Sequence, residues 1–240
     1  MKTKILVLVT VWQRPEIFSV MAQNLRFPDW IDANVLCVLS KTDRYFQTNL
    51  ETCEKHKFNM CFTDNKPVGN KRNFGLKCGM QWDWNYYFKI DSDDVLNFNY
   101  WDVLKPYLND GCPFIGTNQY CAYNSETGES QIVTYKKVIG GGKVISRAIV
   151  EKCFNKLGYL YPPKQNSGLD NTSQRNIFEA TEIEPVKLEE CFLLDIKSEE
   201  NINHYRGLKW MPCTPVSYSY ILENFGDIEK QLNEKQKSSI

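Results

Sequence analysis

The stretch that decides the fold is Tyr86-Tyr-Phe-Lys-Ile-Asp-Ser-Asp-Asp94, an apolar run that ends in three carboxylates within four residues. The run is typical of a buried β-strand, and alternate side chains of an extended chain share a face. We therefore expect Asp91 and Asp93 to converge on one point while Asp94 points elsewhere. Two carboxylates at a sheet edge repel each other unless a cation or hydrogen-bond donors offset their charge. A divalent ion such as Mg²⁺ binds such carboxylates together with phosphate oxygens, whereas the structural alternative is an acidic turn in which Asp94 caps a helix.

Other strands of this buried type precede the acidic stretch. Continuous apolar, β-branched runs cover residues 4–10 and 33–39, and a shorter run covers residues 59–63. Such runs are typical of a parallel sheet that is covered on both faces. Helical patterns lie between the strands, at residues 16–25, at 44–57 and from 64 towards 80. We predict an α/β fold with a mostly parallel central sheet flanked by helices, and a ligand site at the carboxyl ends of the strands.

The second half of the chain has a looser pattern and predicts a small antiparallel portion. Strands are expected at residues 114–123, 130–138 and 191–196, and helices at 100–108, 147–157 and 173–180. Pro106 is expected to kink or end its helix. Gly140-Gly-Gly142 is expected to be a hinge or a point of close approach. We predict one domain over residues 1–225, followed by a polar tail over 226–240 that is partly helical.

Charge and cysteine content narrow the class of protein. The 29 basic and 29 acidic side chains give a net charge of zero, so no global field favours nucleic acid or a membrane surface as the partner. Nine cysteines without a Cys-x-x-Cys pair indicate reduced thiols rather than a zinc cluster or a disulfide framework. The apolar run near Met1 is too short for a signal peptide, and no segment approaches the roughly 20 apolar residues of a membrane span. We therefore expect a soluble cytoplasmic protein.

The turn Asp64-Asn-Lys-Pro-Val-Gly-Asn-Lys-Arg-Asn-Phe-Gly-Leu76 opens the helix that precedes the acidic stretch. Exposed amides at a helix start, with Lys71 and Arg72 beside them, suit a phosphate group. The structural alternative is an ordinary capped helix with a solvated basic turn.

Three segments occur in a characteristic order over about the first hundred residues. They are Ile5-Leu-Val-Leu-Val-Thr-Val-Trp-Gln-Arg-Pro15, Gly69-Asn-Lys-Arg-Asn-Phe-Gly75 and Phe88-Lys-Ile-Asp-Ser-Asp-Asp94. Together they resemble the GT-A nucleotide-diphospho-sugar glycosyltransferases, most closely the inverting, family-2-like enzymes. The second segment has one residue fewer before its arginine than the family's Gly-x-x-x-Arg-Asn-x-Gly element. The third matches the family's Asp-x-Asp signature. A lone Asp-x-Asp is weak evidence for the family, but the three segments in this order are strong evidence.

The resemblance implies a nucleotide-sugar half at about residues 1–97 and an acceptor half at about 98–225. The residues that it assigns to the nucleotide-sugar donor are Thr10, Val11, Gln13, Arg14, Ser40, Asn65, Asn70, Arg72, Asp91 and Ser92. It also implies that Asp93, Asp91 and His204 hold Mn²⁺ or Mg²⁺, although a lone loop histidine is often only a solvated side chain. The ion would stabilise the negative charge that develops on the leaving diphosphate.

The second half departs from the family pattern at two points. The family has a catalytic base that often follows a glutamate, and here the nearest match is Asp170 after Leu169. We expect Asp170 to deprotonate the acceptor hydroxyl, with Glu179 and Glu182 as weaker candidates and an N-cap role for Asp170 as the structural alternative. The family's acid after the second strand, which pairs with the nucleobase, is missing. Ser40 or Asp43 would take the role of this acid, and uridine is the preferred nucleoside of the donor.

The leading hypothesis is a metal-dependent inverting glycosyltransferase that uses a UDP-sugar and an acceptor hydroxyl in glycan or polysaccharide synthesis. The first alternative, a nucleotidyltransferase of related fold, is disfavoured because residues 10–15 contain no glycine. The second alternative is a non-catalytic sugar-binding module. Aromatic residues that would stack on sugars in that case are Trp82, Trp84, Tyr86, Tyr87, Trp101, Tyr159, Tyr161 and Trp210. Protein-linked glycan, polysaccharide, lipid carrier and modified DNA base all remain open as acceptors.

Overall fold

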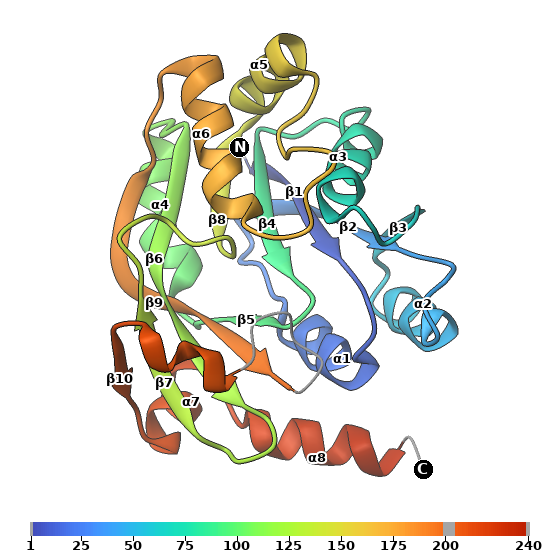
Figure 1. The fold of residues 1–240 in the computed structure, drawn as a ribbon, viewed down its shortest axis with the longest axis vertical. Helices are drawn as coiled ribbons and strands as arrows, with labels where there is room; N and C mark the ends of the chain where they lie inside the picture. The colour runs from blue at the N-terminus through green and yellow to red at the C-terminus, as the bar shows by residue number, and fades with distance from the viewer. Residues whose placement is uncertain (1, 199–204, 239–240) are drawn as a thin grey trace.

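Parallel strands form the first half of the sheet in the computed structural model, which describes residues 2–198 and 205–238. β1 (Thr3–Thr10) lies between β2 (Ile31–Leu39) and β4 (Tyr86–Asp91), and β3 (Asn59–Phe62) pairs with β2. All of these pairings are parallel, as the continuous apolar runs predict. The carboxyl ends of the strands therefore share one edge of the sheet (Figure 1).

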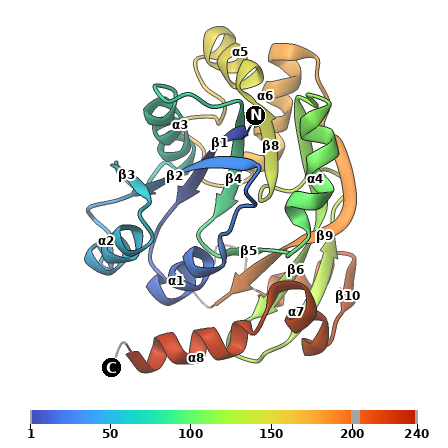
Figure 2. The ribbon, with the colours of Figure 1, turned by 180° about the vertical axis from the view of Figure 1, so that it is seen from behind.

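Helices cover both faces of this sheet. Alternate side chains of β1 point to opposite faces, and each set packs against a different group of helices. Ile5, Val7 and Val9 pack with α1 (Pro15–Asn24), α2 (Phe46–Lys55) and α4 (Tyr100–Asn109). Leu6 and Leu8 pack on the other face with α3 (Val68–Gly79), α5 (Arg147–Leu157) and α6 (Leu169–Thr181). Figure 1 shows the face of α5 and α6, and Figure 2 shows the opposite face with α1 and α4. Burial of the strands on both faces explains the continuous apolar run at residues 5–9 of β1.

Antiparallel strands extend the sheet beyond β4. β8 (Lys143–Ser146) pairs with β4 and with β6 (Phe114–Asn124), and β7 (Ser130–Thr134) and β10 (Cys213–Pro215) follow in order. β9 (Val186–Lys197) runs parallel to β6 and pairs antiparallel with the short β5 (Asp94–Leu96). The predicted fold class, an α/β domain with parallel strands first and antiparallel strands in the second half, is thereby confirmed.

Several elements differ from the expectation at their ends. β9 begins at Val186 instead of residue 191, and β5, β10 and the 3₁₀ helix η1 (Tyr205–Trp210) have no counterpart among the predicted elements. Pro106 does not end α4, which continues to Asn109. β5 and β10 are three-residue strands, and such strands form through pairing with distant segments rather than through a local pattern.

The polar tail expected from residue 226 contains α8 (Ile228–Ser238), which follows α7 (Tyr218–Phe225). Ile228 and Leu232 are buried in the same apolar cluster as Ile17 of α1. The Asn24 side chain donates a hydrogen bond to Gln231 Oε1 at 2.7 Å. The two buried side chains of α8 therefore make it part of the packing around α1.

The nine cysteines are all free thiols, as expected, and six of them are buried. Within residues 2–198 and 205–238, none of the helices is long and apolar enough to cross a membrane.

Close packing explains both glycines of the segment Gly69–Gly75. A Cβ atom at Gly69 would lie 2.1 Å from the carbonyl oxygen of Pro162. A Cβ atom at Gly75 would lie 2.5 Å from Val38 Cγ2 and 2.6 Å from Leu8 Cδ1. Side chains at these positions would push α3 away from the sheet and from the loop that leads into α6.

We predict that Gly75→Ala lowers the free energy of unfolding by about 1–2 kcal/mol, because overpacking against the sheet outweighs the gain in helix propensity. Lys77→Ala, on the exposed side of the same helix, is the matched control and should change the free energy by less than about 0.5 kcal/mol. Urea unfolding followed by circular dichroism measures both variants. Equal stability of Gly75→Ala and the unmodified chain would show that α3 is not in tight contact with β1 and β2.

Candidate active site

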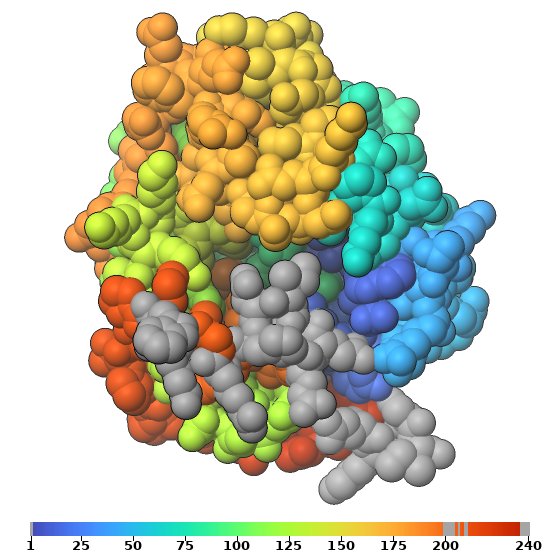
Figure 3. Space-filling model, viewed as in Figure 1, coloured from blue at the N-terminus to red at the C-terminus, as the bar shows by residue number. Residues whose placement is uncertain are grey.

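The polar residues expected to bind a ligand gather where β1, β2 and β4 end. Thr10, the last residue of β1, has Asp91 of β4 and Val38 of β2 as its neighbours in register. The loops that follow these strands therefore open at the same edge. In the space-filling view the surface is hollowed beneath the residues that lead into α6, where segments of the first half come to the surface (Figure 3).

The loop between β1 and α1 has an unusual backbone conformation. Gln13 and Arg14 both have positive φ angles, 56° and 46°, which side chains other than glycine rarely adopt. The Gln13 N–H donates to Asp43 Oδ2 at 2.7 Å, and Arg14 Nη1 lies 3.0 Å from Asp93 Oδ2. Contacts on both residues thus hold the loop in a conformation that costs free energy, as is common at functional sites.

Asp43 and Ser40, the two candidates for the nucleobase partner, are buried, with 6% and 1% of their surface exposed. Besides Gln13, Asp43 accepts hydrogen bonds from Tyr45 N at 3.0 Å and from Asn49 Nδ2 at 3.2 Å. Ser40 Oγ lies 2.9 Å from the hydroxyl oxygen of Thr42. Both residues shape the loops at this edge, and contact with a nucleobase stays a prediction.

Lys71 joins two of the predicted donor segments. It is 1% exposed, and its Nζ donates to Val11 O at 2.6 Å and to Asn65 Oδ1 at 2.9 Å. Burial lowers its pKa to about 8, although Asp43 nearby acts in the opposite direction. Lys71 therefore connects two loops inside the protein. It is neither solvated nor facing a phosphate site, contrary to the prediction from its place in the turn. Its neighbour Asn70 is exposed.

Arg72 connects the expected donor residues with the expected base. Its guanidinium lies 3.2 Å from Asp91 Oδ1 and 3.5 Å from Asp170 Oδ1, and it stacks over the ring of Tyr161. Asp91 also forms an ion pair with Lys89. Although burial opposes ionisation, Lys89 and Arg72 hold the pKa of Asp91 below its usual range. The structure thus brings together two acids that are far apart in the sequence, and a shared cation keeps them close.

Asp170 is not the N-cap of its helix. Gly168 occupies that position with φ of 66°, so Asp170 is the second residue of α6. Lys143 Nζ donates to the Asp170 carbonyl oxygen at 3.2 Å. Burial opposes ionisation here too, but Lys89, Lys143 and Arg72 together lower the pKa of Asp170. Its carboxylate is therefore charged at neutral pH, as a general base requires.

The segment Gly140–Gly142 passes between carboxylates, which confirms the expected close approach. A Cβ atom at Gly140 would lie 2.2 Å from Asp170 Oδ2, and one at Gly141 would lie 2.7 Å from Asp94 Oδ2. Gly142 has φ of 68° and donates its N–H to Lys89 O at 2.9 Å. Only backbone fits here, so this segment can border both acids without covering them.

A group of three carboxylates lies next to this segment. Oxygens of Asp93, Asp94 and Asp195 lie within 4.8 Å of one another, and Asp94 is paired with Asp195 between β5 and β9. The expectation that Asp94 points away from Asp93 is therefore wrong. β4 ends at Asp91 and a turn follows, so the alternation of an extended strand does not continue through the acidic stretch. Ser92, in that turn, is buried.

Burial and mutual repulsion govern the protonation of this group. Burial raises the pKa of Asp94 well above its usual range, and the charges of Asp91, Asp93 and Asp195 add to the effect. Burial likewise raises the pKa of Asp195 to about 6, while Lys197 opposes the shift. Hard carboxylate oxygens suit Mg²⁺ or Mn²⁺. Asp195 Oδ1 is also buried without a hydrogen-bond partner among the described residues, so the donor set fits a divalent cation.

Asp195 is a member of this group that the sequence motifs do not indicate. It lies within a strand that was predicted, and the only local signal is one acid inside the apolar run Phe192–Ile196. His204, the third expected metal ligand, lies outside the described residues. A metal-binding role for Asp91 also stays a prediction, since Lys89 and Arg72 already contact its carboxylate.

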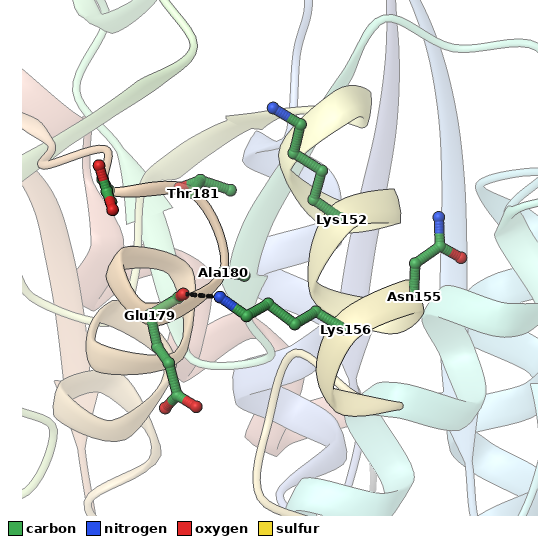
Figure 4. A pocket seen from close by; sticks show the side chains of 7 residues that line it. Lys152, Asn155, Lys156, Glu179, Ala180 and Thr181 are labelled. Carbon is green, nitrogen blue, oxygen red and sulfur yellow. Dashed lines mark hydrogen bonds between the residues drawn. The ribbon is translucent and has the colours of Figure 1, made fainter.

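Glu179 and Glu182, the weaker candidates for the base, lie at the other end of α6. Both border a hollow of about 540 Å³ between α5 and α6 (Figure 4). Lys156 reaches across it and donates to the Glu179 carbonyl oxygen at 2.6 Å, which satisfies an end of α6. Glu179 lies nine positions after Asp170 in α6, or roughly 14 Å along the helix, so the structure does not bring Glu179 or Glu182 to Arg72.

Comparison with known proteins shows similarity in structure alone. No protein-family model matches the sequence, and no curated protein matches it. The solved structure of S. aureus TarS 1–349 in complex with UDP-GlcNAc matches with a TM-score of 0.56 at 15% identity, covering 83% of this chain and 60% of that one. The mannosyltransferase PcManGT from Pyrobaculum calidifontis, in complex with GDP-Man and Mn²⁺, matches with a TM-score of 0.60 at 11% identity.

The match to PcManGT covers 85% of this chain and 59% of that one. A crystal structure of S. aureus TarS extends the overlap to 99% of this chain at a TM-score of 0.52 and 13% identity, and covers 42% of TarS. The chain thus spans no more than 60% of the length of these solved structures. These matches in structure show that this chain has a GT-A fold, the fold of the glycosyltransferase structures that it resembles.

Proposed function

We propose that the chain is a metal-dependent, inverting glycosyltransferase that moves a sugar from a nucleotide-diphosphate donor, with UDP preferred, to a hydroxyl of a glycan or polysaccharide. The contact that carries this proposal is Arg72 between Asp91 and Asp170 at the carboxyl ends of β1 and β4. It places a charged carboxylate beside residues that resemble a nucleotide-sugar site. The GT-A fold and the nucleotide-sugar complexes of TarS and PcManGT support the same function.

Cations at this edge suit a donor that carries a diphosphate. Arg14 and Arg72 are both held against carboxylates at the carboxyl ends of the strands, and guanidinium groups bind phosphate oxygens with two parallel hydrogen bonds. Asp93 would hold a divalent cation, which when bound supplies Lewis-acid stabilisation of the charge on the leaving diphosphate. Gln13 and Asn65, in the neighbouring loops, offer further polar groups to the nucleotide.

Asp170 would perform the proton transfer. Its ionised carboxylate takes the proton of the acceptor hydroxyl while the acceptor oxygen forms a bond to the anomeric carbon. The bond from that carbon to the diphosphate oxygen breaks on the opposite side, the nucleoside diphosphate leaves, and the configuration of the sugar is inverted. Lys89, Lys143 and Arg72 together keep the carboxylate charged, and the contact with Arg72 helps to fix its position, because the Asp170 side chain is itself 43% exposed.

A thermal-shift screen of nucleotide sugars with and without Mn²⁺ tests the donor class. A ligand that binds only the folded chain raises the melting temperature according to its affinity and concentration. We expect UDP-sugars to give the largest shift, and to need Mn²⁺ for it. If no nucleotide sugar changes the melting temperature in either condition, the proposed donor is wrong.

We predict that Asp93→Asn lowers Mn²⁺-dependent hydrolysis or transfer of the UDP-sugar by about 10²–10³-fold, because a stabilising contact to the leaving diphosphate is lost. Removing Mn²⁺ with a chelator should have a similar effect on the unmodified chain. Asp110→Asn, an exposed acid at the end of α4, is the control of equal charge change and should retain full activity. Release of UDP measures all three. Full activity of Asp93→Asn would exclude a metal-binding role for this residue.

We predict that Asp170→Asn lowers kcat by about 10²–10⁴-fold while the thermal shift caused by the donor is kept, because only the proton transfer is lost. Between pH 5 and 8 the activity of the unmodified chain should show no acid limb from this group, because the lowered pKa leaves Asp170 ionised throughout. Steady-state kinetics with a hydroxyl acceptor measures both. An unchanged kcat in Asp170→Asn would assign the base elsewhere.

A further inference from the structure

We propose that Asp195 on β9 is a ligand of the divalent cation, so that both halves of the chain build the cation site. The inference rests on the proposed function, which assigns the cation to Asp93. It adds a residue from a strand that lies outside the three segments on which the resemblance depends.

The backbone fixes Asp195 next to the acidic turn. β5 and β9 form an antiparallel ladder in which Asp94 is opposite Asp195. The Ile196 N–H also donates to the Asp93 carbonyl oxygen at 2.9 Å. The main chain on both sides of Asp195 is therefore locked to the turn that carries Asp93. Side-chain position follows from this pairing rather than from a chance approach on the surface.

The oxygens of Asp195 are placed for an ion. Oxygens of Asp93 and Asp195 belong to the group within 4.8 Å, and two ligand oxygens on opposite sides of Mg²⁺ are about 4.2 Å apart. A shift of a few tenths of an ångström would bring both to one ion. Asp195 Oδ1 is buried and has no hydrogen-bond partner among the described residues. Buried carboxylate oxygens are normally satisfied, so this one points to a ligand.

Asp94 has a different part in the group. It is 4% exposed, and its Oδ2 accepts the Asp91 N–H at 2.8 Å. The backbone of Gly141 also lies directly against its carboxylate. Asp94 therefore holds the turn in shape, and Asp93 and Asp195 remain as the two carboxylates of the group that would share the cation.

Each of these two carboxylates also forms an ion pair with a basic side chain. Arg14 pairs with Asp93, and Lys197 pairs with Asp195 through Oδ2. The competing interpretation is that Asp195 serves only to neutralise Lys197, which lies over the ring of Tyr120. That interpretation explains the ion pair of Asp195 Oδ2. It explains neither why Asp195 Oδ1 is buried without a hydrogen bond nor why the backbone pairs Asp195 with the acidic turn.

Titration of the full chain with Mn²⁺ in the absence of nucleotide, followed by electron paramagnetic resonance of the free ion, tests the proposal. We expect Asp195→Asn to raise the Kd about 10–100-fold, a loss of the size seen when groups that support a metal site are removed. Asp93→Asn should weaken binding at least as much. Asp110→Asn, the exposed control, should bind Mn²⁺ like the unmodified chain.

Lys197→Met provides a second test that does not depend on the folding of Asp195→Asn. Removing the competing cation should tighten Mn²⁺ binding severalfold, and should increase the thermal stabilisation that Mn²⁺ gives. If Asp93→Asn weakens binding but Asp195→Asn and Lys197→Met leave the Kd unchanged, the proposed cation stands and the role of Asp195 is refuted. If the unmodified chain does not bind Mn²⁺, or if Asp93→Asn has no effect, the metal dependence in the proposed function fails first.

Discussion

The bridge that Arg72 forms between Asp91 and Asp170 is the interaction on which the rest of the site depends. Arg72 is 8% exposed, and a buried charge is stable only if groups of opposite charge surround it. Its two partners come from β4 and α6, which belong to different halves of the chain. One guanidinium therefore aligns the end of the parallel sheet with the start of a helix on its face. The donor side and the acceptor side of the proposed reaction meet at this residue.

The same demand for charge balance extends through the surrounding residues. Each of the acids Asp91, Asp93 and Asp195 has a basic partner, respectively Lys89, Arg14 and Lys197. Lys89, Lys143 and Lys197 are all at most 5% exposed, which is unusual for lysine and requires acids nearby. A site with this many paired charges is stiff, because moving any one group leaves another unpaired. Such preorganisation is what the proposed reaction needs, because it would stabilise the charge on a leaving diphosphate.

Local patterns in the sequence predict the first half of the molecule well. β1 is a continuous apolar run and β3 lies almost at the predicted residues 59–63; in the second half, α5 begins and ends at the predicted residues 147–157. The three segments of the resemblance indeed meet at one edge of the sheet. The grouping of Asp94 with Asp93 was missed, because it depends on a turn that breaks the strand. The place of Asp195 in the group could not be predicted, because it results from the pairing of β9 with β5. Pairing between distant strands has no pattern in the local sequence.

The helix α8 also bears on the site, although it lies far from it along the chain. It packs on α1, and α1 in turn contacts β5, the strand that follows Asp93. Arg14 is the N-cap residue of α1, so α1 positions one member of the Arg14–Asp93 pair and touches the strand that directly follows the other. Displacement of α8 would be transmitted through α1 to both charges at once. Packing of the last helix, α8, thus helps to keep Arg14 of the first loop aligned with Asp93.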